Sequence, residues 1–162
     1  GANIGNFRYK EAENFIGRVH SSMNVGDLLL MGVDLRKNPN IIRLAYDDPH
    51  GITASFNLNL LLRMNRELGA DFNLDGFSHY AFYEPVDGEM LSYLVSNIDQ
   101  VVYFDALDWH AEFKQNEFIH TEVSKKYSIN ELEMIAESQK FSIVQHFFDK
   151  RNYFVDTLLK AK

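Results

Sequence analysis

The sequence predicts an α/β protein that carries an α+β insertion, and three observations support this fold class. Apolar residues at helical spacing from Ala12 to Met23 lead into Asp27–Leu35, an apolar strand without alternation. Such a strand is expected to be buried on both faces, as in a parallel α/β sheet. After Lys37 the pattern changes to helices followed by antiparallel strands, and near Ser128 the pattern of helix and strand returns.

This change and return of pattern predicts one domain with an insertion, not two domains in series. Residues 1–37 are expected to hold a loop, a helix and a strand, and residues 127–162 a helix and a closing hairpin. The insertion is expected to span residues 38–126. The elements expected after the first strand are helices 40–46 and 52–68, antiparallel strands 77–83, 90–95 and 100–104, a strand 109–113 that continues this meander, a helix from Ser128 to about Gln139, and strands 141–148 and 153–159.

Three local signals refine these elements. Ser128 begins S-I-N-E, a capping box in which Glu131 reaches back to open a helix. Asp87-Gly88 is a turn that joins two antiparallel strands. The longer inserted helix is expected to point five apolar side chains inward, namely Phe56, Leu60, Leu61, Met64 and Leu68.

The composition limits the classes of function. Of the 162 residues, 46% are hydrophobic, which is enough for a packed core, and the net charge of −7 argues against nucleic acid and anionic membranes as partners. There is no cysteine, so disulfides, thiolate metal sites and thiol nucleophiles are excluded. The longest apolar run, Leu28–Val33, is far too short to span a membrane, and a cytoplasmic protein is expected. The chain opens at Gly1 inside a loop-like stretch, which we interpret as the start of a fragment.

Histidine and aspartate residues do not form a recognisable metal or acid–base motif. The six histidines include no i,i+4 pair on a helix and no H-E-x-x-H, so no metal site is expected. Asp47 and Asp48 could form an acid–base pair or a Ca²⁺ ligand pair. Beside Pro49 and Gly51, a turn is the favoured interpretation.

Four polar residues are candidates for binding a small molecule. Asn6 lies in GANIGNF, where two glycines permit unusual backbone angles, and is either a positioned amide or a left-handed turn residue. Tyr46 ends an apolar stripe and is either a core residue or a ligand contact. Glu122 and Ser124 lie two apart in an extended segment, so both side chains leave on one side. They either grip a polar ligand or form a solvated strand face.

Four longer stretches add a resemblance to a known family. They occur in the order GANIGNF, GDLLLMGVDLRKNP, LAYDDPHGITASFNLNLLLRMNRELGADFNLD and HTEVSKKYS. Together they resemble the histidine-specific, S-adenosylmethionine-dependent methyltransferases, which methylate the α-amine of histidine in ergothioneine synthesis. The resemblance spans nearly the whole chain but only the second half of the family's length.

The resemblance implies the C-terminal part of a Rossmann-like class I methyltransferase fold with a substrate-binding domain inserted late. Asp27–Leu35 would be the fifth strand of the sheet and 141–148 the sixth, with 153–159 as the antiparallel seventh strand between them. The insertion, residues 38–126, would hold most of the substrate domain. The ligand crevice of such a sheet lies at the carboxyl ends of its strands.

The resemblance also implies roles for the four candidates. Asn6 and Tyr46 would hold the α-carboxylate of the amino acid, and Glu122 and Ser124 would hold the imidazole, which offers one N–H donor and one acceptor. The implied partner is therefore a free amino acid.

Two further positions follow from the same resemblance. Ser92 takes the place of a methionine that lies against the substrate side chain, although an alignment shifted by one residue puts Tyr93 there. Gly1 would contact S-adenosylmethionine, which is bound mainly by the upstream half of the protein. No catalytic residue is assigned in this chain, and any general base is expected upstream.

Two other classes of function remain open from the sequence. One is a non-catalytic amino-acid-binding module of the same fold, and the other is an interaction protein that uses its many aromatic residues. In each case the chain alone is expected to lack turnover. Because the strand Asp27–Leu35 would have a bare edge, self-association of the chain is also expected.

Overall fold

The computed structural model describes residues 2–162, so Gly1 lies outside the described residues. Close packing groups these residues into two units. The first unit contains the chain up to Pro39, together with Glu84–Met90 and Val123–Lys162, and the second contains Asn40–Tyr83 and Leu91–Glu122. The turn segment Glu84–Met90, which lies within the predicted insertion, therefore packs with the first unit.

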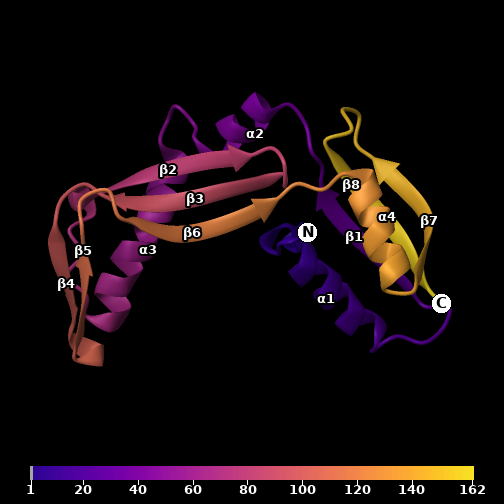
Figure 1. Cartoon of the computed structure of the whole chain (residues 1–162), viewed down its shortest axis with the longest axis horizontal. Coiled ribbons are helices and arrows are strands. Elements are labelled where there is room, and N and C mark those ends of the chain that lie inside the picture. Colours follow the sequence, from indigo (N-terminus) through magenta and orange to yellow (C-terminus); the bar gives the residue numbers. More distant parts are fainter. Residues whose placement is uncertain (1) are drawn as a thin grey trace. The chain divides into compact units, whose positions relative to one another are not determined.

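The first unit combines helices with a three-stranded sheet. Its elements are η1 (Asn3–Asn6), α1 (Tyr9–His20), β1 (Leu28–Asp34), α4 (Ile129–Ser138), β7 (Phe141–Phe148) and β8 (Phe154–Ala161). The strand order is β1-β8-β7, and β8 runs antiparallel to both neighbours (Figure 1). Strands β7 and β8 form the closing hairpin that the sequence predicts.

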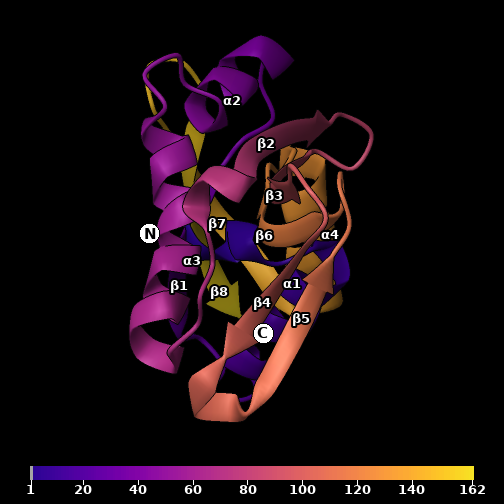
Figure 2. The same ribbon diagram turned by 90° about the vertical axis from the view of Figure 1, so that its left-hand side faces the viewer.

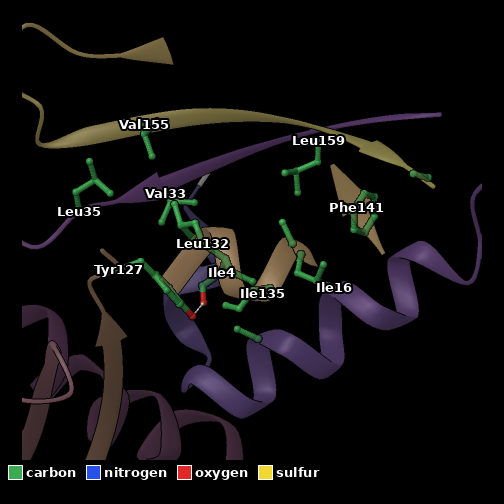
Figure 3. Close-up of a cluster of buried hydrophobic side chains, with 13 residues drawn as sticks. Ile4, Ile16, Val33, Leu35, Tyr127, Leu132, Ile135, Phe141, Val155 and Leu159 are labelled. Carbon is green, nitrogen blue, oxygen red and sulfur yellow. Dashed lines mark hydrogen bonds between the residues drawn. The ribbon is translucent and has the colours of Figure 1, made fainter. Parts of the chain in front are cut away.

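Strand β1 is buried on one face only, so the prediction of burial on both faces is wrong. Val33 is fully buried, whereas Leu28 and Leu30 are 59% and 60% exposed. Leu29 and Met31 alternate with these two and pack into the core. Helices α1 and α4 cover this one face (Figure 3).

The core of the first unit lies between the sheet and its two helices (Figure 3). Tyr127 is its largest fully buried side chain, and its hydroxyl donates to the carbonyl oxygens of Ile4 at 3.2 Å and Phe7 at 3.0 Å. These bonds tie η1 to the segment between β6 and α4. Other residues of the same core are Val33, Leu35, Leu132, Ile135, Phe141, Val155 and Leu159.

Helix α4 begins as the capping box predicts. Ser128 Oγ accepts from the backbone N–H of Glu131 at 3.2 Å, and the Ser128 N–H donates to Glu131 Oε2 at 2.7 Å. Two orphan donors at the helix start are satisfied in this way. Leu132, Ile135 and Ala136 then face the core at helical spacing.

The second unit packs helices against strands. Its main elements are α2 (Pro39–Tyr46), α3 (Ile52–Leu68), β2 (Phe77–Glu84), β3 (Glu89–Ser96), β4 (Gln100–Phe104), β5 (Trp109–Phe113) and β6 (Phe118–Lys125), with short 3₁₀ turns η2 (Leu74–Gly76) and η3 (Asp105–Leu107). The ends of β2, β3 and β6 extend into the first unit. Neighbouring strands run in opposite directions in the sheet β2-β3-β6, and β4 and β5 form a separate hairpin (Figures 1 and 2).

The expected continuous meander is therefore wrong. Strand β3 pairs with β6 and not with β4. The pairing with the β6 segment begins at Ser96. Its N–H donates to the Glu117 carbonyl at 2.9 Å, and its carbonyl accepts from the Asn116 N–H at 2.8 Å. Because these long-range bonds occupy the edge of β3, β4 forms its sheet with β5 instead.

Helix α3 is rotated from the predicted orientation. Phe56 and Leu60 are 73% and 38% exposed, so two of the expected inward residues face out. Leu61 is fully buried, and the polar Asn57 is buried on the same face. Asn57 can face inward because Thr121 of β6 donates to its side-chain oxygen at 2.7 Å. A satisfied polar pair thus sets the rotation of the helix.

The core of the second unit is aromatic. Phe72 lies at its centre, with ring centroids 5.7 Å from Phe77 and 5.5 Å from Phe104, both edge-on. Leu61 and Leu94 complete the contact between α3 and β3. Within residues 2–162, no helix is long and apolar enough to cross a membrane.

Candidate functional site

The loop that carries Asn6 lies against strand β6. Asn6 is the exposed last residue of η1 and has no positive φ, so the left-handed turn interpretation is wrong. Gly5 also has no positive φ. A Cβ on Gly5 would lie 3.2 Å from the Lys125 carbonyl oxygen and 3.8 Å from Ser124 Oγ. This glycine is therefore needed for close approach, not for unusual backbone angles. It brings the Asn6 loop beside Ser124, and the predicted cofactor contact Gly1 lies outside the described residues.

Ser124 is buried in the first unit and bonded to a lysine. Its residue exposure is 8%, and Lys126 Nζ lies 2.7 Å from Ser124 Oγ. An ammonium group is only a donor, so the serine oxygen accepts this bond. The alternative of a solvated strand face is therefore wrong for Ser124.

Lys126 also connects Ser124 to the carboxyl end of strand β1. Its side chain is 3% exposed, and Nζ lies 2.9 Å from Asp34 Oδ2. The other oxygen of Asp34 bonds the Lys37 ammonium. A carboxylate between two lysines thus stands at the strand end where ligands of α/β sheets usually bind.

A second group of charges holds the turn between β2 and β3. Arg36 donates to the carbonyl oxygens of Pro85, Val86 and Asp87, and its guanidinium also pairs with Glu131 at 2.9 Å. Lys125 Nζ bonds the same Glu131 oxygen at 3.0 Å.

The electrostatics of this cluster follow from its bonds. Burial acts to raise the pKa of Glu131, but hydrogen bonds from the Ser128 N–H, Lys125 and Arg36 outweigh it and lower the pKa. Burial raises the pKa of the Tyr127 hydroxyl, which therefore stays protonated as a donor. The Glu131 carboxylate is thus ionised, and the Tyr127 hydroxyl neutral, at neutral pH.

In the second unit, Tyr46 is the half-buried last residue of α2. Its backbone carbonyl lies 2.9 Å from His79 Nε2 on β2. A carbonyl can only accept, so His79 carries a proton on Nε2. His79 Nδ1 is buried without a hydrogen-bond partner among the described residues. His79 therefore fixes the end of α2 and with it the backbone of Tyr46.

Asp48 is a turn residue, as the sequence favoured. Its carboxylate accepts from the backbone N–H groups of His50, Ile52 and Thr53 at 2.8–3.2 Å. These bonds lower its pKa to about 2, and they cap the start of α3. Among the described ion pairs, the Asp47 carboxylate pairs with the exposed Arg43. Among residues 2–162, no three acidic or histidine side chains gather as a metal-ion group would.

Ser92 lies on the face of β3 that packs against α3. Its residue exposure is 1%, and its hydroxyl has no hydrogen-bond partner among the described residues. Thr121 Oγ1 lies 3.0 Å from the Ser92 carbonyl. Glu122, the next residue of β6, is half-buried. A buried polar atom without a partner is rare, so the Ser92 hydroxyl is an exception that needs an explanation.

Tyr93, the alternative to Ser92, lies on the opposite face of the sheet. Its ring centroid is 5.7 Å from Phe118 and 5.2 Å from His120, both on β6. Regular strand alternation places Glu122 on this same face. The structure thus places the two alternatives on different faces of β3.

Sequence reasoning missed Lys126, Asp34 and His79. Lys126 stands in a Lys-Lys pair, which usually indicates solvent exposure, and Asp34 ends a strand like many surface residues. Only the pairing of the segment after β6 with β1, through the Leu35–Tyr127 bridge, brings the buried Lys126 to the half-buried Asp34. The position of Asp34 at the carboxyl end of the strand is the sequence signal that could have indicated this ion pair.

The fold is mixed α/β, and a cluster of charged and polar side chains lies at the carboxyl end of β1. Residues 1–161 match the family model of the histidine-specific, SAM-dependent methyltransferases, so the chain belongs to that family. The resemblance noted in the sequence is confirmed.

Two curated relatives illustrate the match. The histidine N-alpha-methyltransferase of Mycolicibacterium smegmatis is 39% identical over 127 residues, which cover 78% of this chain and 40% of the relative. Ergothioneine biosynthesis protein 1 of Schizosaccharomyces pombe is 32% identical over 148 residues, which cover 91% of this chain and 19% of the relative. The chain therefore spans less than half the length of these relatives.

Among solved structures, an S-adenosylmethionine-dependent methyltransferase from Clostridium acetobutylicum matches with a TM-score of 0.44 and 10% identity, over 94% of this chain and 52% of that one.

Proposed function

We propose that this chain is the C-terminal part of an enzyme that transfers methyl groups from S-adenosylmethionine to the α-amine of histidine. The observation that carries the proposal is the family match over residues 1–161, together with the 39% identity to a relative named histidine N-alpha-methyltransferase. The buried, lysine-bonded Ser124 supports it, because a site for a polar ring needs fixed polar groups. As the chain has no cysteine, we place the enzyme in the cytoplasm.

The fold is assigned in the same terms. Strands β1, β8 and β7 would be the fifth, seventh and sixth strands of a Rossmann-like methyltransferase sheet, and their order and directions support this. The second unit would be the inserted substrate-binding domain, within residues 38–126, and the chain on either side of it would complete the methyltransferase part.

The α-carboxylate of the amino acid would be held by Asn6 and Tyr46. The exposed amide of Asn6 follows the tightly packed Gly5, so the loop presents it from a fixed backbone. Tyr46 is fixed through its carbonyl by His79. An amide N–H and a phenol O–H are both donors suited to a carboxylate.

The imidazole would be held by Glu122 and Ser124, two residues apart on β6. Glu122 accepts from the ring N–H, and Ser124 bonds the other nitrogen. A hydrogen bond to a charged group contributes about 1.5–3 kcal/mol. A site that bonds both ring nitrogens therefore rejects amino acids without an imidazole more strongly than an apolar pocket does.

Ser92 would line the pocket beside the substrate side chain, on the strength of its buried hydroxyl without a described partner. Tyr93 is the second candidate, because it shares a face with His120 and, by alternation, with Glu122. Ser92→Met and Tyr93→Phe separate the two. The wall residue is the one whose substitution changes the preference between histidine and other amino acids.

The chain's contribution to catalysis would be orientation. S-adenosylmethionine supplies an activated methyl group as a sulfonium, and the described residues contain no glycine-rich turn after a strand to hold it. Binding the carboxylate and the ring fixes the uncharged amine between them, and reacting atoms need to lie about 3–3.5 Å apart. None of residues 2–162 is assigned as general base, and the chain alone is proposed to be inactive.

A label-transfer assay with the full-length parent tests the function. Methyl-labelled S-adenosylmethionine should label histidine, and Glu122→Ala should lower kcat/KM by at least about tenfold, the equivalent of 1.4 kcal/mol. Glu112→Ala on β5, an exposed position, is the matched control and should leave the rate unchanged. No label above blank for histidine or any other amino acid would refute the proposal.

Calorimetry on the same protein distinguishes the enzyme from a non-catalytic binding module, since the module would bind histidine without transferring label. An interaction protein would bind no amino acid, and Glu122→Ala and Asn6→Ala would change nothing.

We also propose that the isolated chain self-associates through β1. Its outer edge has no partner strand among the described residues, and Leu28 and Leu30 are exposed beside it. Light scattering of the isolated chain should show a mass that grows with concentration. A strict monomer at high concentration would count against this.

A further inference from the structure

We propose that Tyr127 is a positioning residue that holds the Asn6 loop in place for the α-carboxylate of the substrate. The inference rests on the proposed function, in which Asn6 meets that carboxylate. Tyr127 touches no substrate atom and acts only through the loop. Both residues, and the carbonyl groups that connect them, belong to the first unit.

The Tyr127 hydroxyl bonds the loop on both sides of Asn6. Its oxygen lies 3.2 Å from the Ile4 carbonyl oxygen, a bond drawn in Figure 3, and 3.0 Å from the Phe7 carbonyl oxygen. A hydroxyl has one hydrogen, so the two carbonyls share a single donor. The Ile4 carbonyl also accepts from the Phe7 N–H at 3.2 Å, whereas no other donor reaches the Phe7 carbonyl among residues 2–162. Loss of the hydroxyl would therefore leave the Phe7 carbonyl without a protein partner.

This hydroxyl is the one polar link between the loop and a distant segment. Within the described part of the chain, every other hydrogen bond of residues 2–7 is local. These local bonds run from the Gly5 N–H to the Ala2 carbonyl at 2.9 Å and from the Phe7 N–H to the Ile4 carbonyl. Such turns shape the loop but do not place it against the rest of the unit. The position of the exposed Asn6 therefore depends on Tyr127 and on the packing of Ile4.

Tyr127 is itself fixed at the carboxyl end of β1. Its N–H donates to the Asp34 carbonyl at 3.1 Å, and its carbonyl accepts from the Arg36 N–H at 3.0 Å. Its side chain is fully buried, and burial raises the pKa of the hydroxyl, which keeps its hydrogen at neutral pH. The tyrosine thus ties the loop to the strand end where ligands of α/β sheets usually bind.

A loosened loop should weaken binding by lowering the population of the competent state. If the loop also adopts positions in which Asn6 cannot reach the carboxylate, the measured affinity falls in proportion to the competent fraction. A typical net hydrogen bond is equivalent to a factor of about three to ten. We therefore expect Tyr127→Phe to lower the affinity for histidine about three- to tenfold.

A double-mutant cycle, measured by calorimetry on the full-length parent, tests this coupling. Asn6→Ala should also lower the affinity for histidine. Once Asn6→Ala is present, adding Tyr127→Phe should cost less than about twofold, because the loop then has no amide to position. Tyr127→4-aminophenylalanine keeps a donor at the same place and should restore the affinity to within about twofold of wild type.

Thr157→Val is the matched control for the loss of a buried hydroxyl. Thr157 is also fully buried in the first unit, and its hydroxyl lies 2.9 Å from His146 Nδ1. The variant should lower the stability in urea but leave the affinity for histidine unchanged.

Hydrogen exchange without substrate gives a measurement that does not depend on activity. The N–H groups of Gly5 and Phe7 should exchange about three- to tenfold faster in Tyr127→Phe than in wild type, because the hydroxyl no longer holds the loop. In Thr157→Val they should exchange at the wild-type rate. Unchanged exchange in Tyr127→Phe, or equally faster exchange in both variants, would overturn the inference.

The outcomes distinguish this inference from the proposed function. If wild type neither binds nor methylates histidine, the proposed function fails, while faster exchange in Tyr127→Phe would still show that the hydroxyl holds the loop. If wild type binds histidine and Tyr127→Phe leaves the affinity unchanged, or lowers it equally with and without Asn6→Ala, this inference alone fails. Should Tyr127→Phe not fold, Tyr127→4-methylphenylalanine, which fills the place of the hydroxyl without a donor, replaces it in each measurement.

Discussion

The hydroxyl of Thr121 on β6 donates a hydrogen bond to Asn57 Oδ1 on α3 at 2.7 Å. This bond sets which face of α3 meets the sheet. Thr121 is the residue directly before Glu122 in β6. A structural contact between helix and strand thus lies directly beside a proposed substrate residue.

Breaking that bond should destabilise the full-length protein. Thr121→Val leaves the buried Asn57 oxygen without its donor, so we expect a loss of about 1–3 kcal/mol in the free energy of unfolding by urea. The double variant Asn57→Leu with Thr121→Val removes both polar partners and should regain part of this loss. Equal loss in the single and double variants would contradict the role of the pair.

The Glu131 cluster should make stability depend on pH. In the folded protein the pKa of Glu131 lies below the ordinary 4.5. The contribution of its carboxylate to stability is therefore complete above pH 4.5 and is lost as the pH falls through the folded pKa. Glu131→Gln should cost about 1.5–3 kcal/mol at pH 7 and progressively less below pH 4.5, since protonated glutamate resembles glutamine.

Urea unfolding at pH 7, 5 and 3 measures the dependence on Glu131. The control is Glu67→Gln, which removes an exposed pair with Arg63 and should change little at pH 7. A difference between wild type and Glu131→Gln that stays constant down to pH 3 would refute the electrostatic account.

Two glycines with similar backbone angles should respond differently to alanine. Gly51 has φ +69° and nothing within 4 Å of an added Cβ, so Gly51→Ala should cost only about 1–2 kcal/mol of left-handed strain. At Gly88, with φ +71°, the Cβ would lie 2.6 Å from the Lys126 carbonyl and 2.7 Å from Arg36 Nε. Gly88→Ala should therefore cost about 3–5 kcal/mol. Thermal unfolding measures both losses of stability. If Gly51→Ala and Gly88→Ala lose similar amounts, the turn at Gly88 relaxes around the added Cβ and this prediction is wrong.

Substitutions of the neighbouring Asp47 and Asp48 should distinguish a helix-capping role from a catalytic role. Asp48→Ala removes the acceptor of three backbone N–H groups at the start of α3 and should lower the Tm, whereas Asp47→Ala removes only an exposed pair and should change it little. The pKa of Asp48 is lowered from 3.8 to about 2, so its contribution is present above pH 3.8 and disappears toward pH 2. Loss of methyl transfer in folded Asp47→Ala would instead favour the acid–base interpretation.

Much of the fold could be predicted because its signals are local. The capping box at Ser128, the turn at Asp87-Gly88 and the hairpin of β7 and β8 each depend on residues close in sequence, and each is present. Helices α2 and α3 lie within a residue of their predicted bounds for the same reason.

Features set by distant contacts could not be predicted from local pattern. Strand β3 pairs with β6 instead of β4, and Phe56 faces out because a polar pair at Asn57 turns α3. Gly5 looked like a residue for unusual backbone angles, but the Lys125 carbonyl beside it is what excludes a side chain. Each outcome depends on a partner far along the chain.

The candidate site divides in the same way. The sequence proposed Asn6, Tyr46, Glu122 and Ser124 through a family resemblance, and the family is shown, while their roles stay predictions. The structure added Lys126 and Asp34, which no motif indicated.

The sequence by itself determined the family, the start of α4 and the identity of the polar residues on β6, because residue type and short spacing encode these. Only the tertiary structure decided that two consecutive lysines are buried. The reason is that a buried charge is tolerated only beside an opposite charge, and the carboxylate of Asp34 reaches Lys126 only after β1 and the segment following β6 have paired.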